Sequence, residues 1–240
     1  MNFWTAAFLF ALLAEIILVP CYLFAPFFKG GRRPLVAKCV CAALFILIGV
    51  FAMIASSNYR AFAYLMLGGL FFSSFGDYFL GVAMKGKNFI FGVLSFTVAH
   101  LLYSLAFVSA LAAENPARPF VNRNEMVSFV VLLALLAVSS FVLKLDMGKL
   151  TGLIFIYACV ILAMLVKAIS LAKTLYEAGD SYWPVATLLL GSGAVLFVVS
   201  DAVLSLTLFA GKNSRKMTVL NLSTYFGAQT LLAASIYFIR

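Results

Sequence analysis

Charged side chains are scarce in this sequence. They make up 10% of its 240 residues, while 65% of the residues are hydrophobic and the mean hydropathy is +1.12. Soluble domains carry about 25% charged and about 45–50% apolar residues. The composition therefore excludes a soluble domain and predicts an integral membrane protein. Because the stretches between the apolar segments are short, residues 1–240 are expected to form a single integral-membrane domain.

Cysteine and histidine are also rare. The four cysteines form no Cys-x-x-Cys pair, and the spacing of Cys39 and Cys41 directs the two thiols to different helix faces. Neither a disulfide framework nor a metal knuckle is therefore supported. The only histidine, His100, cannot supply the two or three imidazoles usual in catalytic zinc sites, so no metal and no cofactor is expected. A metal held by two aspartates, His100 and water is the less favoured alternative to proton chemistry. His100 is expected to orient an acid or to bond a substrate oxygen, with a helix-packing role as the alternative.

Eight apolar stretches are present, each close to the roughly 20 residues that cross a bilayer. They predict an all-α fold, a polytopic membrane bundle of eight transmembrane helices. The expected spans cover about 4–28, 35–55, 60–84, 89–112, 126–144, 150–171, 184–210 and 217–239.

The net charge of +9 is concentrated in loops on one side of the predicted bundle. Loops after the odd-numbered spans hold ten Lys and Arg, and the opposite side holds five. The positive-inside rule then places those loops in the cytoplasm and both termini outside, in a bacterial inner membrane. Membrane lipids, rather than nucleic acid, are the expected partners of this charge. The ten residues are Lys29, Arg32, Arg33, Lys85, Lys87, Lys144, Lys149, Lys212, Arg215 and Lys216.

Two aspartates lie deep within long apolar runs, Asp77 in residues 68–84 and Asp201 in residues 188–210. A carboxylate in hydrocarbon is costly, so it persists mainly where it faces protein or water and has a function. Each aspartate also precedes a short basic loop that contains Gly-Lys-Asn. This similarity predicts a parallel four-plus-four repeat that relates the two aspartates by a pseudo-two-fold axis. Chance resemblance between apolar helices is the alternative.

The depth of polar residues predicts a pocket that opens toward the cytoplasmic half of the membrane. At 1.5 Å per residue, Asp77 lies about 12 Å and Asp201 about 15 Å from the cytoplasmic ends of their spans. Four more polar side chains lie about 12–18 Å from the same side, namely Tyr157, His100, Tyr225 and Gln229.

Other polar residues in the spans have more than one interpretation. Lys38 can pair with an aspartate or bind a phosphate, with snorkelling to the interface as the alternative. Tyr103 shares a helix face with His100, and such polar stripes also join helices in membranes. Glu15, near the middle of the first span, is interpreted as a helix–helix hydrogen bonder.

These residues resemble the YhhN family of membrane lysoplasmalogenases. The resemblance runs through most of the chain and is densest in residues 72–80, 89–107, 191–201 and 221–231. Its elements are Gly-Asp, Ala-His-x-x-Tyr, Ser-Asp and Tyr-x-x-x-Gln, in this order. It implies a catalytic domain that cleaves the vinyl-ether bond of lysoplasmenyl-ethanolamine or -choline, a lysophospholipid, to a fatty aldehyde and a glycerophospho-alcohol. It implies Asp77 and Asp201 as the essential acids.

Vinyl ethers hydrolyse by slow protonation of the alkenyl carbon, which creates an oxocarbenium ion that water then attacks. This chemistry needs a protonated general acid and a negative charge near the cation, which two unequal carboxyls supply. Asp77, beside His100, is the predicted proton donor. Asp201, beside Tyr225 and Gln229, is the predicted ionised partner, and the reverse assignment stays open. The other predicted substrate-binding residues are Tyr103, Tyr157 and Lys38, the last two as candidates for the headgroup phosphate.

Two other functions stay open. Buried Asp, His and Tyr layers also form the proton relays of transporters, although the aspartate spans contain no mid-membrane proline. Phe75-Gly76-Asp77 partly matches the Gly-x-Gly-Asp signature of intramembrane aspartyl proteases, but Ser74 replaces the first glycine. The sequence makes no prediction of the oligomeric state.

Overall fold

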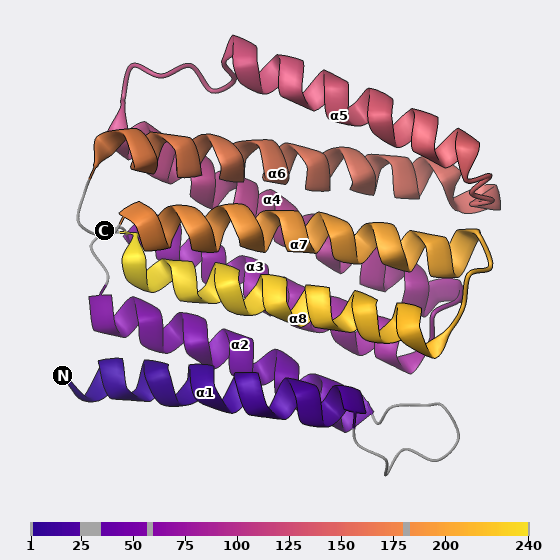
Figure 1. Ribbon diagram of the computed structural model, residues 1–240, viewed down its shortest axis with the longest axis horizontal. Helices are drawn as coiled ribbons and strands as arrows, with labels where there is room; N and C mark the ends of the chain where they lie inside the picture. Colours follow the sequence, from indigo (N-terminus) through magenta and orange to yellow (C-terminus); the bar gives the residue numbers. More distant parts are fainter. Residues whose placement is uncertain (1, 25–34, 57–59, 180–182, 240) are drawn as a thin grey trace.

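The computed structural model describes residues 2–24, 35–56, 60–179 and 183–239. Within these ranges the chain is all-α, as predicted. Its α-helices run side by side, each antiparallel to the next along the chain (Figure 1). They are α1 (Phe3–Phe24), α2 (Leu35–Ser56), α3 (Arg60–Val82), α4 (Gly86–Glu114), α5 (Arg123–Val142), α6 (Thr151–Ala178), α7 (Trp183–Phe209) and α8 (Arg215–Phe238), and the 3₁₀ helix η1 (Gly148–Leu150) precedes α6.

Seven of these helices, α1 to α7, are long and apolar enough to cross a membrane, which makes the protein a polytopic membrane helix bundle. Helix α8 has 24 residues and runs the length of the bundle beside α7 (Figure 1). It is less apolar because its buried face carries Asn221, Gln229 and Ser235. An eighth crossing by α8 stays a prediction.

Local sequence signals explain where two helices depart from the predicted spans. Helix α5 begins three residues early because Asn122 and Glu125 form a capping box, in which each side chain accepts a bond from the other's backbone N–H. Helix α6 continues beyond the predicted end at residue 171, through a polar segment, as far as Ala178. It stops at Gly179, whose positive φ of 67° suits the left-handed C-cap.

The helix contacts support the four-plus-four repeat. Helix α3 packs against α4 as α7 packs against α8, and α2 contacts α8 as α6 contacts α4. The match is incomplete among the described residues: α1 contacts both α2 and α8 whereas α5 contacts only α6, and the α3–α8 contact has no counterpart between α7 and α4. Helix α5 accordingly lies at the edge of the bundle (Figure 1).

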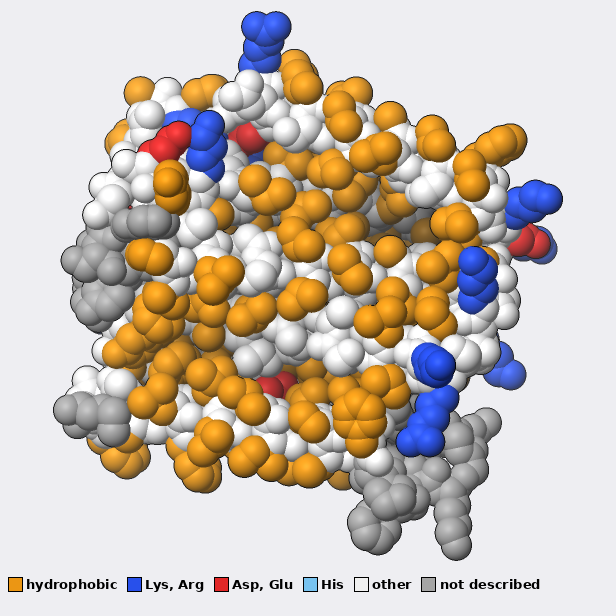
Figure 2. All heavy atoms as spheres, viewed as in Figure 1, with side chains coloured by type: hydrophobic (Ala, Val, Ile, Leu, Met, Phe, Trp, Pro, Cys, Tyr) orange, Lys and Arg blue, Asp and Glu red, His pale blue; other side chains and the backbone are white. Residues whose placement is uncertain are grey.

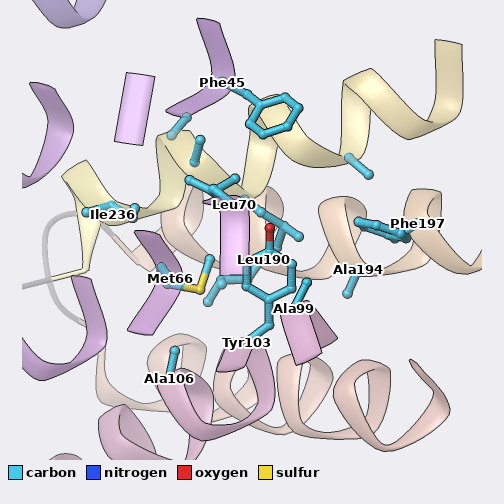
Figure 3. Packing of buried hydrophobic residues seen from close by; sticks show 14 of the residues in the cluster. Phe45, Met66, Leu70, Ala99, Tyr103, Ala106, Leu190, Ala194, Phe197 and Ile236 are labelled. Atoms are coloured by element: carbon cyan, nitrogen blue, oxygen red, sulfur yellow. The ribbon is translucent and has the colours of Figure 1, made fainter. Parts of the chain in front are cut away.

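Glycine allows a close approach between α3 and α4. A Cβ atom on Gly69 would lie 2.3 Å from the ring of Tyr103. Figure 3 shows Tyr103 among Leu70, Ala99 and Leu190 in the buried core. Small residues at such contacts let helix backbones come close, which is a main source of packing in membranes.

The surface agrees with a membrane protein that has one basic end. Figure 2 shows hydrophobic side chains over the middle of the face in view and several Lys and Arg at the right-hand end. The α3–α4, α5–α6 and α7–α8 loops lie at that end in Figure 1. Of the basic residues predicted there, Lys29, Arg32 and Arg33 lie outside the described residues, as does the end of the first predicted span.

Candidate functional site

Asp77 and Asp201 line one cavity, together with residues of α2, α4, α6 and α8. Its volume of about 70 Å³ has room for a few water molecules. Met84 and Phe209 also line it, and they lie at the ends of α3 and α7 next to the basic loops. The cavity therefore extends toward the basic end of the bundle. Most of its remaining wall is apolar.

Asp77 is buried and accepts hydrogen bonds at both carboxylate oxygens. Lys38 Nζ lies 3.0 Å from Oδ1, and the Tyr225 hydroxyl donates to Oδ2 at 2.6 Å. Lys38 Nζ also lies 3.2 Å from the backbone carbonyl oxygen of Asp77. A cation and a second donor on one carboxyl group favour its ionised form. Asp77 thus has two neighbouring groups that stabilise its carboxylate form.

A chain of hydrogen bonds directs the Tyr225 proton toward Asp77. The Tyr103 hydroxyl donates to Gln229 Oε1 at 2.8 Å, and Gln229 Nε2 donates to Tyr225 Oη at 3.2 Å. Ser73 Oγ lies 3.4 Å from the Tyr103 hydroxyl. Since Gln229 uses its oxygen as acceptor and its nitrogen as donor, Tyr225 is left to donate to Asp77.

Asp201 has a different environment. Its Oδ2 accepts a hydrogen bond from the Tyr157 hydroxyl, and His100 Nε2 lies 3.3 Å from that hydroxyl oxygen. No Lys or Arg among the described residues forms an ion pair with Asp201. A carboxyl group in an enclosed site without a cation favours its neutral form. Asp201 thus lacks, among the described residues, the cation that stabilises a carboxylate at Asp77.

The predicted partners of the two aspartates are wrong. The sequence placed His100 beside Asp77, and Tyr225 with Gln229 beside Asp201, whereas the structure exchanges these partners. The reason is the helix order: α8 packs against α3, and α4 packs against α6, which brings His100 to Tyr157. The position of a residue along its helix does not determine which helices are its neighbours.

Three predicted site residues stand behind the cavity wall and do not line it. His100, Tyr103 and Gln229 are fully buried, and all three are parts of the hydrogen-bond chains to the aspartates. Lys38, Tyr157 and Tyr225 do line the cavity. Of the interpretations offered for Lys38, the structure gives the pairing with an aspartate.

Sequence reasoning missed a reciprocal contact beside Asp201. Asn221 Nδ2 donates to the backbone oxygen of Ser200 at 2.8 Å and to its Oγ at 3.0 Å, and Ser200 Oγ donates to the Asn221 backbone oxygen at 3.1 Å. Both residues line the cavity and fix α7 to α8 there. Ser200 directly precedes Asp201, and Asn221 lies one helical turn before Tyr225. These positions were the sequence signal that could have indicated the contact.

The interpretation of Glu15 as a helix–helix hydrogen bonder is wrong. Both of its carboxyl oxygens are buried and lack a hydrogen-bond partner among the described residues. No group of three or more His, Cys, Asp or Glu in the described ranges is arranged to hold a metal ion.

Comparisons with known proteins agree on one family. A model described as the YhhN family matches residues 32–236. Lysoplasmalogenase TMEM86A of Bos taurus is 32% identical over 167 residues, and that of Homo sapiens is 31% identical over 167 residues. Each match covers 70% of this chain and 62% of the relative, so the chain spans less than two thirds of those proteins. No solved structure is detectably similar.

Proposed function

The chain belongs to the YhhN family, and we propose that it is a membrane lysoplasmalogenase. It hydrolyses the vinyl-ether bond of a lysoplasmalogen to a fatty aldehyde and glycerophospho-ethanolamine or -choline. The relatives named lysoplasmalogenase support this activity. The observation that carries the proposal is that two carboxyl groups in unlike environments, Asp77 and Asp201, line one cavity.

In this proposal Asp201 is the general acid. It lines the cavity, and Tyr157 holds one of its oxygens. Among the described residues no cation pairs with it and its other oxygen has no hydrogen-bond partner, so that oxygen can present a proton. Proton transfer from Asp201 to the alkenyl carbon creates an oxocarbenium ion. Positioned proton transfer contributes about 10²–10⁴-fold to such reactions. The role therefore falls to the aspartate that the sequence had favoured as the ionised partner.

Asp77 stabilises the cation. Its two donors, Lys38 and Tyr225, hold the carboxylate in place before the reaction. A negative charge that is already oriented in an enclosed site costs no reorganisation when the cation forms. Glycosidases use the same division between an acid and an ionised carboxylate around an oxocarbenium-like centre.

Water completes the cycle without a net change in protons. After Asp201 has given its proton to carbon, its carboxylate takes a proton from the attacking water. The resulting hemiacetal collapses to the aldehyde and the glycerophospho-alcohol. Asp201 is then protonated again and ready for the next substrate.

The walls of the cavity suit an amphipathic substrate. Leu80, Phe89 and Val93 offer apolar surface for the hydrocarbon chain. The cavity extends toward the basic end, where the headgroup phosphate finds positive charge. We place this end in the cytoplasmic half of a bacterial inner membrane, with both termini outside.

Helix continuity argues against the transporter alternative. Transporter sites are commonly built from broken helices near the middle of the membrane. Here α3 and α7, which carry the two aspartates, are each continuous, over Arg60–Val82 and Trp183–Phe209.

A comparison of matched lipids tests the proposal. The purified protein is incubated with a lysoplasmalogen and with ester and alkyl-ether lysolipids of the same headgroup and chain, and aldehyde release is measured. We expect aldehyde from the lysoplasmalogen alone, and none from Asp77→Asn or Asp201→Asn. Asp146→Asn, a change at an exposed loop aspartate, serves as the control and retains activity. Aldehyde release by either site variant at the wild-type rate would remove that residue from the mechanism.

A further inference from the structure

One lysine lines the cavity in which the proposed reaction releases an aldehyde. Lys38 is 8% exposed and forms part of the cavity wall with Asp77 and Asp201. Lysine amines form Schiff bases with carbonyl compounds in enclosed sites. We propose that Lys38 forms a reversible iminium bond with the fatty aldehyde, which makes the cavity a covalent aldehyde-binding site. This inference rests on the proposed function.

The geometry brings the lysine nitrogen close to the reacting carbon. Among the described residues, Lys38 Nζ donates only to Asp77, at Oδ1 and at the backbone carbonyl oxygen. An ammonium group has three N–H bonds, so one remains for a ligand in the cavity. Because Asp77 is the carboxylate that stabilises the oxocarbenium ion, that carbon and Lys38 Nζ lie against the same side chain.

The condensation needs no further reactant. Asp77 takes one proton from the ammonium group, and the free amine attacks the carbonyl carbon, which forms the C–N bond of a carbinolamine as a second N–H proton moves to oxygen. Asp77 then returns its proton to the hydroxyl group, the C–O bond breaks and water leaves. The iminium keeps the third proton and the positive charge. Atoms and charge balance, and nothing is oxidised or reduced.

The surroundings favour this product. The iminium carries the same charge as the ammonium group that it replaces, so its ion pair with Asp77 is retained. Leu80, Phe89 and Val93 provide apolar wall beside the carbonyl end of the aldehyde. Water in the cavity reverses the reaction, so the aldehyde is held and then released.

Lys167 provides an internal control in the same protein. It is also 8% exposed and also pairs with a carboxylate, since its Nζ lies 2.8 Å from Glu125 Oε2. It contacts the backbone of Phe120 in the α4–α5 connection and does not line the cavity. Burial and ion pairing are therefore comparable, whereas Lys167 lines a different and smaller cavity of about 30 Å³ and shares its carboxylate with Arg118.

Reductive trapping tests the inference. The purified wild-type protein is incubated with a long-chain saturated aldehyde and cyanoborohydride, and its peptides are analysed by mass spectrometry. We expect the alkyl-amine adduct on Lys38 at several times its level on Lys167. An alkyl-ether lysolipid, which occupies the cavity without being cleaved, should lower the adduct on Lys38 but not on exposed Lys85. Lys38→Arg keeps the positive charge and should abolish the adduct at that position.

Equal adduct on Lys38 and Lys167, or no adduct on Lys38, would overturn the inference. Because the aldehyde is supplied directly, trapping does not depend on turnover. Hydrolysis of lysoplasmalogen without an adduct on Lys38 rejects the iminium alone. An adduct on Lys38 in a preparation that cleaves no lysoplasmalogen rejects the hydrolase alone.

Discussion

Lys38 on α2 lies 3.0 Å from Asp77 on α3, and no cation is similarly paired with Asp201 among the described residues. This ion pair makes the two carboxyl groups of the cavity unequal. Removing one partner of a buried ion pair leaves an uncompensated charge, which typically costs about 3–5 kcal/mol. The two aspartates should therefore differ in their contribution to stability even though both are needed for turnover.

We expect Asp77→Asn to lower the free energy of unfolding by about 3–5 kcal/mol, because Lys38 is then buried without its partner. Asp201→Asn should change it by about 1 kcal/mol or less, because only one neutral hydrogen bond is altered. Chemical denaturation in detergent measures both values. The double variant Lys38→Met with Asp77→Asn should regain stability without regaining activity. Equal destabilisation by the two single variants would contradict the assigned charges.

The tyrosines that bond the aspartates should also differ in effect. Tyr157→Phe removes the only hydrogen bond to Asp201 that the described residues provide, whereas Tyr225→Phe leaves Asp77 with Lys38. Asp201 becomes a carboxylate as it gives up its proton in the transition state, and a hydrogen bond to a charged group contributes about 1.5–3 kcal/mol. We therefore expect kcat to fall about 10–100-fold for Tyr157→Phe and less for Tyr225→Phe, because Lys38 remains beside Asp77. Steady-state aldehyde release measures the ratio. The control is Tyr64→Phe, at an exposed position, which should match the wild type.

The glycine beside Asp77 should tolerate no larger side chain. A Cβ atom on Gly76 would lie 2.5 Å from the ring of Phe96, so Gly76→Ala should separate α3 from α4 and lower stability by about 1–3 kcal/mol. Gly191→Ala on α7 is the matched control, since its Cβ would meet nothing within 4 Å. It should stabilise the helix by about 0.5–1 kcal/mol. In thermal unfolding, Tm should fall for Gly76→Ala and rise for Gly191→Ala. A Gly76→Ala protein with the Tm of the wild type would contradict the close packing of Gly76 against Phe96.

A second ion-pair cluster fixes the α4–α5 connection to α6. Glu125 bonds Arg118 at 3.0 Å and Lys167 at 2.8 Å, and it is buried. Glu125→Gln leaves two cations without their carboxylate and should cost about 3–5 kcal/mol. The control Glu177→Gln breaks the exposed pair with Lys173, 3.6 Å apart, and should cost about 1 kcal/mol or less. Denaturant midpoints for the two variants give the comparison, and similar midpoints would show that the cluster adds little.

The sequence predicted the bundle well because twenty-residue apolar runs leave few alternatives in a membrane. It also predicted that Asp77 and Asp201 face a common cavity, since both are too costly to expose to lipid. The sequence analysis predicted the wrong neighbouring residues for these two aspartates. A position along a helix gives depth, but the rotation of α8 toward α3 follows from packing over the whole bundle, so the contact of Tyr225 with Asp77 was not predictable.

Two further features depend on three-dimensional contacts. The pairing of Ser200 with Asn221 requires knowledge of which faces of α7 and α8 meet. The lack of a partner for Glu15 is a property of its surroundings, because an apolar helix with one acid normally suggests a hydrogen bond. In both cases the residue type indicated a buried polar group, but the sequence did not show which residues surround it.

Hydrolysis in deuterium oxide tests the central claim most directly, namely that an enclosed acid in this cavity protonates a vinyl-ether carbon. The purified protein is given a lysoplasmalogen in deuterium oxide, the aldehyde is reduced at once to the alcohol, and its mass and NMR spectra are recorded. Our account predicts one deuterium on the carbon next to the former carbonyl carbon. Aldehyde without deuterium at that carbon, or no aldehyde at all, would contradict it.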